Sequence, residues 1–265
     1  MKKINLTDGT KIHCLKETEA LVLDEHINGY LEIGLEISEK DAIIDVGANI
    51  GVFGMRLSQK FKNIPIYSFE PIPEIYKTLK KNAEDSQNPN FKTYMMGISN
   101  KAQLLEFTYY PNSPALSTSH PEVWQNDNNH FNYAIEGSIS TMRSKFWWSK
   151  LIPNFFIPFI ARYLQSNQQK ISSQVITLSD FIKKEKIQKI QLLKIDCEGE
   201  EINVLSGVQK THWRKIESIL MEINDINHNL KMAKNILSKN GFQKIKLIKE
   251  KGFEKTNLIN LYATK

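Results

Sequence analysis

Short apolar runs and amphipathic segments alternate along two parts of the chain. The first part predicts strands and intervening helices at 42–46, about 52–60, 64–69, about 73–83 and 91–96. The second part predicts strands at 191–196, 217–223, 242–248 and 258–263, with helices ending near 205 and spanning 229–239. This alternation is typical of a parallel sheet with helices on both faces. The last two strands have no helix between them, which predicts an antiparallel hairpin at a sheet edge.

A long interruption, residues 109–173, separates the two parts. It begins with the turn-rich sequence YYPNSP, passes through a polar stretch at 125–129, and ends with an aromatic run from Phe146 to Tyr163. A segment this long inside a compact domain is usually functional or forms helices of its own. Because the two flanking parts must join in one sheet, we expect a single domain over 1–265. Residues 1–40 would form an N-terminal cap, and residues 109–173 an inserted lid.

The aromatic run has two interpretations. It could form lid helices that bury an apolar face and are broken at Pro153 and Pro158. It could also form a hydrophobic wall for an acyl chain, or a patch that touches a membrane or a carrier domain. The prolines argue against a long amphipathic membrane helix. We favour a lid that also lines the substrate site, with Trp147 and Trp148 as substrate contacts.

The composition is that of an ordinary globular protein. The chain has 265 residues, of which 41% are apolar and 24% charged. Two cysteines exclude a disulfide scaffold. We find no secretory leader at the N-terminus and no apolar run long enough for a membrane span, so we expect a cytoplasmic protein without stable membrane insertion.

The formal net charge of +6 comes mainly from scattered lysines, which we interpret as a solvated surface. No helix-turn-helix, zinc-finger or RNP pattern accompanies it, so we do not expect nucleic-acid binding. The charge suits an acidic partner, such as an acidic carrier protein.

A glycine-containing turn, DVGANIG at 45–51, follows the first predicted strand. Glycines at such a turn let a ligand approach the backbone, and the next helix offers free N–H groups. The spacing differs from the G-x-G-x-x-G pattern that binds a pyrophosphate. Asp45 would repel phosphate but could pair with an amino group. That combination suits S-adenosylmethionine, which has an amino group and a sulfonium.

Two further acidic positions follow predicted strands. Glu70 follows the next strand along the chain, where a carboxylate can accept hydrogen bonds from both hydroxyls of a ribose. Capping of the following helix is the alternative. Asp196 ends a central strand in the sequence KIDCEGEE, where open α/β sheets place their ligands. The preference of helix N-termini for acidic residues accounts for Glu200 and can account for Glu201. We expect Cys197 to point into the core.

These motifs together resemble the FkbM family of S-adenosylmethionine-dependent methyltransferases. The matching stretches are DVGANIG (45–51), FEPIP (69–73), LLKIDCEGEE (192–201) and the strand ending in MEI (221–223). The outer stretches resemble members that O-methylate polyketide and nonribosomal peptide products. The resemblance implies a Rossmann-like class I methyltransferase fold, with a mostly parallel seven-stranded sheet and an antiparallel C-terminal edge strand.

The resemblance also implies a role for individual residues. The methionine part of the cofactor would lie over Asp45, Gly47, Asn49 and Gly51. Glu70 would bind the ribose. The adenine would lie between two pairs of residues, namely Pro71 and Ile72, and Gly97 and Ile98. Asp196 would lie near the transferred methyl group, and the segment from 17 to 30 would cover the cofactor.

Methylation of a hydroxyl needs a group that takes up its proton. Asp196 is our first candidate by position, followed by His228 and His120. Glu198 and Glu222 are candidate substrate contacts. With Asp196 they could also gather a divalent cation, a question that the sequence leaves open.

Three functions remain open at this stage. The first is O-methylation of a small-molecule secondary metabolite, free or bound to an acyl or peptidyl carrier protein. The second is O-methylation of a sugar hydroxyl on a glycan or glycolipid. The third is a non-catalytic scaffold. A homodimer is compatible with each of them.

Overall fold

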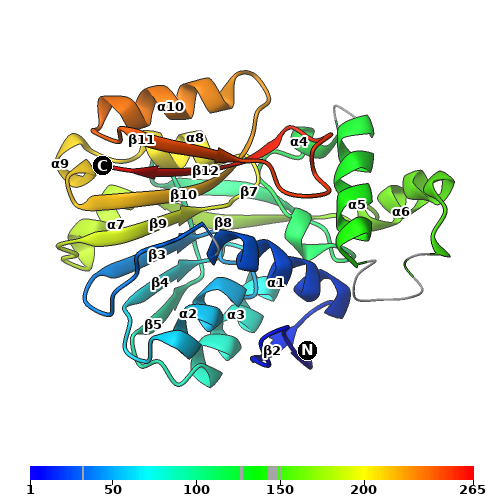
Figure 1. Ribbon diagram of the computed structural model, residues 1–265, viewed down its shortest axis with the longest axis horizontal. Coiled ribbons are helices and arrows are strands. Elements are labelled where there is room, and N and C mark those ends of the chain that lie inside the picture. Colours follow the sequence, from blue (N-terminus) through cyan, green and yellow to red (C-terminus); the bar gives the residue numbers. More distant parts are fainter. Residues whose placement is uncertain (32, 126–127, 143–148, 150) are drawn as a thin grey trace.

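A seven-stranded sheet forms the centre of the molecule, in the strand order β11-β12-β10-β9-β3-β4-β5 (Figure 1). The computed structural model describes residues 1–31, 33–125, 128–142, 149 and 151–265. The strands are β3 (Ala42–Val46), β4 (Ile66–Phe69), β5 (Phe91–Tyr94), β9 (Ile190–Ile195), β10 (Ile216–Asn224), β11 (Lys244–Ile248) and β12 (Leu258–Thr264). Strands β10, β9, β3, β4 and β5 are parallel, whereas β12 runs antiparallel to both of its neighbours. The predicted fold class, including the antiparallel C-terminal edge, is confirmed.

Helices cover both faces of this sheet. One face carries α1 (Glu17–Leu31), α2 (Val52–Lys60) and α3 (Pro73–Asp85). The other face carries α7 (Leu178–Lys184), α8 (Glu201–Ser206), α9 (Lys210–Trp213) and α10 (Asn229–Lys239). The central strands are buried on both sides, which explains their nearly continuous apolar sequences.

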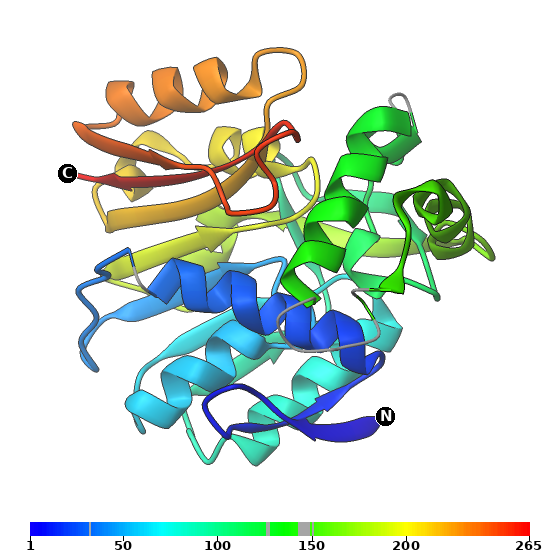
Figure 2. The same cartoon turned by 45° about the vertical axis from the view of Figure 1, so that its right-hand side comes forward.

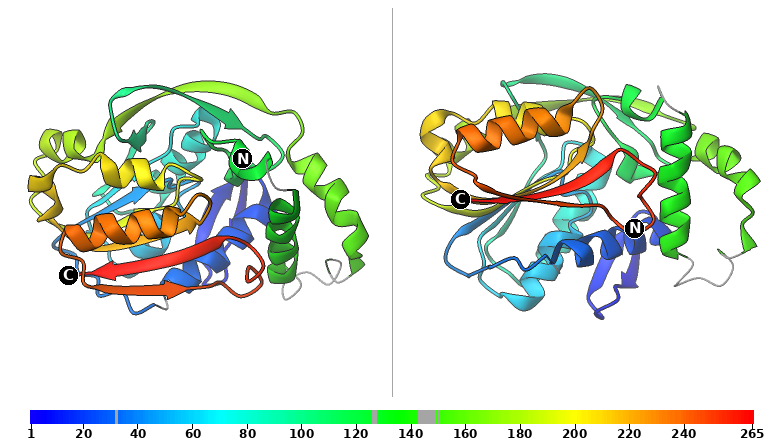
Figure 3. Two further views of the ribbon diagram at one scale, coloured as in Figure 1. Left: turned by 90° about the horizontal axis from the view of Figure 1, so that it is seen from above. Right: turned by 45° about the horizontal axis from the view of Figure 1, so that its top comes forward.

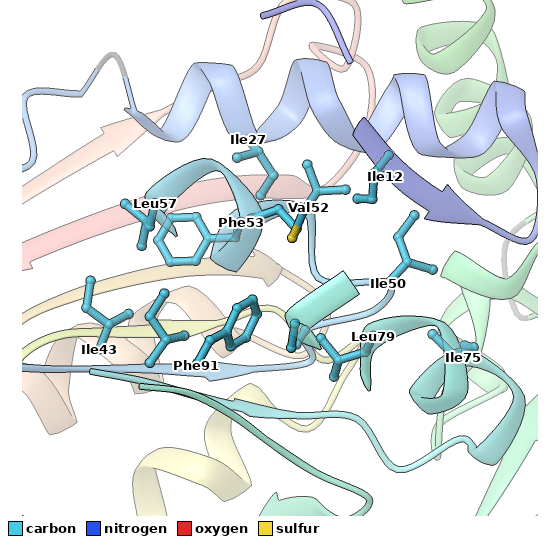
Figure 4. Packing of buried hydrophobic residues seen from close by; sticks show 14 of the residues in the cluster. Ile12, Ile27, Ile43, Ile50, Val52, Phe53, Leu57, Ile75, Leu79 and Phe91 are labelled. Carbon is cyan, nitrogen blue, oxygen red and sulfur yellow. The ribbon is translucent and has the colours of Figure 1, made fainter. Parts of the chain in front are cut away.

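The alternation of side chains along each strand divides the apolar residues between two cores. Ile43 of β3 and Leu192 of β9 face the α1–α2–α3 side, whereas Ile44 and Leu193 face the α7–α10 side. Figure 4 shows the first of these cores, with Ile43 packed beneath α2 and α1. By the same alternation, polar residues at positions 45 and 194 face the side of α1 and α2.

Two smaller sheets flank this centre. In the first, β6 (Gly97–Ser99), β8 (Gln169–Thr177) and β7 (Gln103–Tyr109) lie in the order β6-β8-β7. The second is the hairpin of β1 (Lys2–Asn5) and β2 (Lys11–Cys14). The sequence pattern did not predict either sheet. Strand β8 begins at Gln169, so its first residues lie inside the predicted lid range of 109–173 and pair with β7 instead.

The segment between β7 and β8, residues 110–168, is called the middle segment below. It contains η1 (Pro114–Leu116), α4 (Glu122–Gln125), α5 (Asn128–Met142), η3 (Asn154–Phe156) and α6 (Ile157–Leu164). Helix α5 packs against α1 and α6, and both α5 and α6 lie at one end of the central sheet (Figures 2 and 3). An apolar cluster joins this segment to the 249–257 turn through Phe253 and to β12 through Leu258.

The aromatic part of the middle segment differs from its prediction. Pro158 lies in the first turn of α6, where a missing N–H does no harm, and does not interrupt a helix. Phe155 and Phe159 are 68% and 69% exposed, whereas Ile157 and Ala161 are buried in the apolar cluster, so this stretch buries an apolar face as predicted but not through those two rings. Trp147 and Trp148 lie outside the described residues. None of the helices that the structure describes is long and apolar enough to cross a membrane.

Candidate active site

A cavity of about 520 Å³ opens where the central strands end. Its wall is formed mainly by the loops after β3, β4 and β9, the helix α1 and the middle segment. Residues of the small β6-β8-β7 sheet, the end of β10 and the region from Phe253 to Leu258 complete it. Ligands of open α/β sheets bind at this edge of the sheet. Among the residues predicted for a cofactor, those that line the cavity are Gly47, Asn49, Glu70, Pro71, Ile72, Gly97, Ile98 and Asp196.

The turn after β3 forms the floor of this cavity. Gly47 has φ +76°, and a Cβ atom there would lie 1.7 Å from the backbone carbonyl oxygen of Asp196. The backbone N–H groups of Gly47 and Ala48 both donate to the carbonyl oxygen of Phe69, at 3.1 and 2.9 Å. Only glycine satisfies both the left-handed φ and this close approach. The floor is therefore tied to the ends of both neighbouring strands, β4 and β9.

Gly51 does not line the cavity, which differs from its predicted role under the cofactor. Its φ is +87°, and a Cβ atom there would lie 2.6 Å from Cδ1 of Leu79 in α3. Gly51 therefore allows α2 and α3 to pack closely at the start of α2. Its contribution to a ligand site is indirect.

Asp45 lies beneath the floor and is fully buried, so the predicted direct contact with a ligand amino group is wrong for this side chain. Its Oδ1 lies 3.1 Å from Nζ of Lys194, and the Ser68 hydroxyl donates to its Oδ2 at 3.4 Å. Burial raises the pKa of Asp45, and the charge of Lys194 opposes that shift. Asp45 lies two residues after Ile43 in the same strand, so its side chain points to the same face of the sheet as Ile43, which packs under α2.

Lys194 connects Asp45 to the cavity. Its Nζ also lies 3.3 Å from Oδ2 of Asp196, whose side chain is 25% exposed. Burial lowers the pKa of Lys194, but the charges of Asp45 and Asp196 raise it above the usual range. The lysine is therefore charged and holds Asp196 at the end of β9. Lys194 was not among the predicted site residues, although a lysine inside the apolar run LLKI was a usable signal.

Glu70 presents a buried carboxylate to the cavity. Its Oε2 accepts a hydrogen bond from the backbone N–H of Asn49 at 3.1 Å, and its Oε1 accepts one from Ile72 at 2.9 Å. Burial raises its pKa to about 7, against the effect of these two hydrogen bonds. The two contacts hold the carboxylate in one orientation, and each oxygen keeps a lone pair for a ligand.

Three carboxylates gather at the ends of β9 and β10 and are called the carboxylate cluster below. One oxygen each of Asp196, Glu198 and Glu222 lies within 4.8 Å of the others, and all three residues line the cavity. Burial raises the pKa of Glu198 and of Glu222 well above the usual range, and their neighbouring carboxylates raise both further. The structure thus brings together the three acidic residues that the sequence analysis proposed as a group.

Helix α1 and the turn before β12 add groups that the sequence analysis missed. His26 lines the cavity, and its Nε2 lies 3.4 Å from Oε1 of Glu250. Together with Glu222, these two residues form a second group of potential metal-binding atoms within 4.8 Å. Tyr30 lies one turn after His26 and is 2% exposed. No strand-end motif marks these two positions, although both lie in the segment from 17 to 30 that was expected to cover the cofactor.

Cys197 packs against the apolar core on the α7–α10 side, as expected, and it also lines the cavity. The strand ends at Ile195, and the chain then turns through Glu198 at φ +53° and Gly199 at φ +112°. Strand alternation no longer applies in this turn. Glu201 closes it, because its Oε1 accepts hydrogen bonds from the N–H groups of Cys197 and Gly199 at 3.2 and 2.9 Å.

Neither histidine proposed as a base lines the cavity. His228 is exposed in the left-handed position before α10, so the geometry does not support it as a catalytic group. His120 is held between two carboxylates, with Nε2 2.7 Å from Oε1 of Glu200 and Nδ1 3.0 Å from Oε1 of Glu122. The hydrogen bond that His120 donates to Glu200 raises the pKa of His120 to about 9. A charged histidine is not a proton acceptor at neutral pH, so His120 connects the middle segment to α8 instead.

The site combines a glycine turn, an acidic residue after β4 and an acidic strand end. A family model described as the methyltransferase FkbM domain matches residues 45–244, which include all three. The chain belongs to the FkbM methyltransferase family. Methyltransferase 1 of Beauveria bassiana is 26% identical over 251 residues, or 91% of this chain and 89% of that protein.

Two other proteins carry the family name itself. The 31-O-demethyl-FK506 methyltransferase FkbM of Streptomyces tacrolimicus is 26% identical over 245 residues, covering 91% of this chain and 89% of that one. The crystal structure of the methyltransferase FkbM from Methylobacillus flagellatus has a TM-score of 0.52 at 14% identity and covers 94% of this chain and 55% of that chain. This likeness shows the class I methyltransferase fold.

Proposed function

We propose that this FkbM-family methyltransferase uses S-adenosylmethionine to methylate a hydroxyl group of an apolar small molecule. One observation carries the proposal. A single cavity joins the loops after β3 and β4 to the carboxylate of Asp196, and from there to the apolar inner side of the middle segment. A cofactor, a proton acceptor and an apolar substrate would therefore share one continuous space.

The residues present fit the cofactor. Glu70 offers a fixed carboxylate at the place where a ribose diol can donate two hydrogen bonds. The floor at Gly47 has no room for a side chain, which leaves the backbone itself facing the ligand. Pro71 and Ile72 on one side, with Gly97 and Ile98 on the other, would border the adenine. Asp45 would not contact the cofactor. It would act electrostatically, through its ion pair with Lys194.

Methyl transfer to oxygen requires an aligned nucleophile and a place for its proton. When bound, S-adenosylmethionine supplies an electrophilic methyl group, which the hydroxyl oxygen takes as the carbon–sulfur bond breaks, leaving S-adenosylhomocysteine. Asp196 would accept the hydroxyl proton, because its carboxylate lies in the cavity and Lys194 holds it in place at 3.3 Å. The product is then a methyl ether and a neutral carboxylic acid that returns its proton to water.

The lining of the cavity favours an apolar substrate. The middle segment contributes mainly apolar side chains, namely Leu116, Trp124, Phe131, Ala134, Ile135, Ile139, Met142, Ile152, Ile160 and Leu164. Such a wall binds alkyl, acyl or polyketide carbon chains through burial of apolar surface. A sugar would leave its hydroxyl groups without partners against this wall. The lining therefore supports a metabolite of polyketide or peptide type over a glycan.

A carrier-bound substrate is part of the proposal. The formal net charge of +6 suits an acidic carrier protein, and a tethered chain could enter the same cavity. Four other expectations stay predictions. They are the single-domain boundaries, the function of the middle segment as a lid, a homodimer and a cytoplasmic location.

Methyl transfer can be tested directly. The protein is incubated with methyl-labelled S-adenosylmethionine and a panel of apolar alcohols, carrier-bound hydroxyacyl chains and free sugars, and products are identified by mass spectrometry. We expect labelled methyl ethers from the first two classes. Asp196→Asn should lower turnover by about 100-fold or more while the cofactor still binds. Asp41→Asn is the matched control, because Asp41 pairs with Lys189 at 2.8 Å before β3 and does not line the cavity. Transfer to sugars alone, or full activity of Asp196→Asn, would contradict the proposal.

A further inference from the structure

The carboxylate cluster is short of positive charge. Glu198 and Glu222 take part in no ion pair within the part of the chain that the structure describes. Lys194 reaches Asp196 at 3.3 Å, but it lies equally close, at 3.1 Å, to the fully buried Asp45. One lysine therefore faces two aspartates and two further glutamates. Like charges at this spacing repel one another strongly unless a proton or a cation joins them.

The neighbouring group of His26, Glu222 and Glu250 differs from the carboxylate cluster, because it contains a basic side chain of its own. His26 Nε2 lies 3.4 Å from Oε1 of Glu250, so Glu250 has a basic group beside it. Glu222 belongs to both groups and lies between them. The uncompensated charge is thus concentrated on the side of Asp196 and Glu198, which faces the cavity.

Tyr30 is an independent indication of a polar ligand at this position. Its side chain is 2% exposed, and its hydroxyl has no hydrogen-bond partner among the described residues. Tyr30 lies one turn after His26 on the same face of α1, and a ring nitrogen of His26 lies within 4.8 Å of a carboxylate oxygen of Glu222, so Tyr30 lies on the side of α1 that faces the cluster. A buried hydroxyl without a partner is costly. A hydrated ion between the carboxylates would bring water oxygens that can accept its hydrogen bond.

The geometry matches a hard cation. Mg²⁺ binds oxygens at about 2.1 Å and Ca²⁺ at about 2.4 Å, so ligands on opposite sides of the ion lie about 4.2 to 4.8 Å apart. The three carboxylate oxygens fall within 4.8 Å of one another. Oxygen ligands without a thiolate favour Mg²⁺, Mn²⁺ or Ca²⁺ over zinc or copper. The open side of the cluster leaves room for water or a substrate oxygen.

We propose that Asp196, Glu198 and Glu222 bind one divalent cation of the Mg²⁺, Mn²⁺ or Ca²⁺ class, with its remaining positions open to the cavity. The binding of the ion stands on the cluster alone. Its role rests on the proposed function: the ion would hold the substrate hydroxyl and lower the pKa of that group, which reduces the demand on Asp196 as proton acceptor.

Metal binding is tested without any turnover. The full-length protein is stripped with EDTA and titrated with MnCl₂, and bound Mn²⁺ is counted by electron paramagnetic resonance and calorimetry. We expect one Mn²⁺ per chain, displaced by Mg²⁺ or Ca²⁺. Glu198→Gln and Glu222→Gln should each weaken Mn²⁺ binding at least about tenfold. Tyr30→Phe should weaken it less, since it removes only an indirect contact. Glu217→Gln is the matched control, because Glu217 lies on the same strand as Glu222 and is exposed at the other end.

Folding of the variants is followed in the same experiment. Replacing one carboxylate by an amide removes repulsion, so Glu198→Gln should be at least as stable as the metal-free wild type. Mg²⁺ should raise the Tm of the wild type and not that of this variant. Absence of Mn²⁺ binding to the wild type, or binding by both cluster variants as tight as that of the wild type and of Glu217→Gln, would overturn the inference. If S-adenosylmethionine still binds and reacts in that case, the proposed function survives. If the protein binds the metal but transfers no methyl group, the metal site stands and the proposed function fails.

Discussion

Nζ of Lys194 lies 3.1 Å from Oδ1 of Asp45 and 3.3 Å from Oδ2 of Asp196. Asp45 and Lys194 are paired directly across β3 and β9, and both side chains point to the side of α1 and α2. One buried cation thus joins the first predicted motif of the sequence to the third. The ion pair of Asp45 and Lys194 sets the charge at the floor of the cavity before any ligand binds.

Removing this lysine should destabilise the fold. Lys194→Met leaves Asp45 buried without a counter-charge, and loss of one partner of a buried pair costs about 3–5 kcal/mol. We expect a Tm lowered by about 6 °C or more, measured by calorimetry. Asp45→Asn in the same chain should restore part of the loss, because the unpaired charge is then gone. An unchanged Tm of Lys194→Met would show that the pair contributes nothing to stability.

Gly47 should tolerate no side chain. In Gly47→Ala the new Cβ would meet the carbonyl of Asp196 at 1.7 Å, and the left-handed φ adds strain. We expect a loss of several kcal/mol in the free energy of unfolding by urea, together with weaker cofactor binding. Gly29→Ala in α1 is the control, since nothing lies within 4 Å of its Cβ position and helices favour alanine. Equal stability of the two variants would refute the close contact.

The pair of His120 and Glu200 should make stability depend on alkaline pH. The pKa of His120 rises from 6.5 to about 9 in the folded protein, mainly through its hydrogen bond with Glu200. Its contribution is therefore complete below pH 6.5 and disappears as the pH rises through 9. After solvent screening we expect about 1–2 kcal/mol, visible as a fall in Tm between about pH 6.5 and 9. His120→Gln should lack this step. If the wild type and His120→Gln lose stability in parallel as the pH rises, the pair of His120 and Glu200 is not the cause of that loss.

The apolar wall should control the substrate and leave the cofactor unaffected. Ala134 lies on α5 and lines the cavity, so Ala134→Phe would fill part of the substrate space. We expect KM for a long-chain alcohol to rise about tenfold while the affinity for S-adenosylmethionine stays the same. Tyr133→Phe is the control, because Tyr133 is the neighbouring exposed position on α5. Loss of cofactor affinity in Ala134→Phe would mean that the wall contacts the cofactor instead.

The sequence predicted the central sheet because its strands carry strong local patterns. The helix over 229–239 has the same bounds in the structure, and the turn with Gly47 lies where the glycine spacing indicated. Sheet β6-β8-β7 was missed, since β8 alternates polar and apolar residues only weakly and pairs with a distant strand. Pairing between segments far apart in sequence has no local signal.

Part of the site was predictable because its residues lie at the ends of strands that have a strong local pattern. Residues at strand ends, such as Glu70 and Asp196, could be found because strand position fixes where they lie. The position of Asp45 under the floor depends on strand parity and on its contact with Lys194, which the motif alone did not show. His26 and Tyr30 reach the site from α1, and only the packing of that helix brings them to Glu222.

Cofactor binding by Glu70 tests the central claim most directly. S-adenosylmethionine is titrated by calorimetry into the wild type, Glu70→Ala and the control Glu74→Ala, whose side chain is exposed on α3 and pairs with Lys77. Two hydrogen bonds to a carboxylate contribute about 1.5–3 kcal/mol or more, so we predict one site per wild-type chain and an affinity at least about tenfold weaker in Glu70→Ala. Glu74→Ala should bind like the wild type. Absence of binding to the wild type, or equal affinity of Glu70→Ala, would contradict the account.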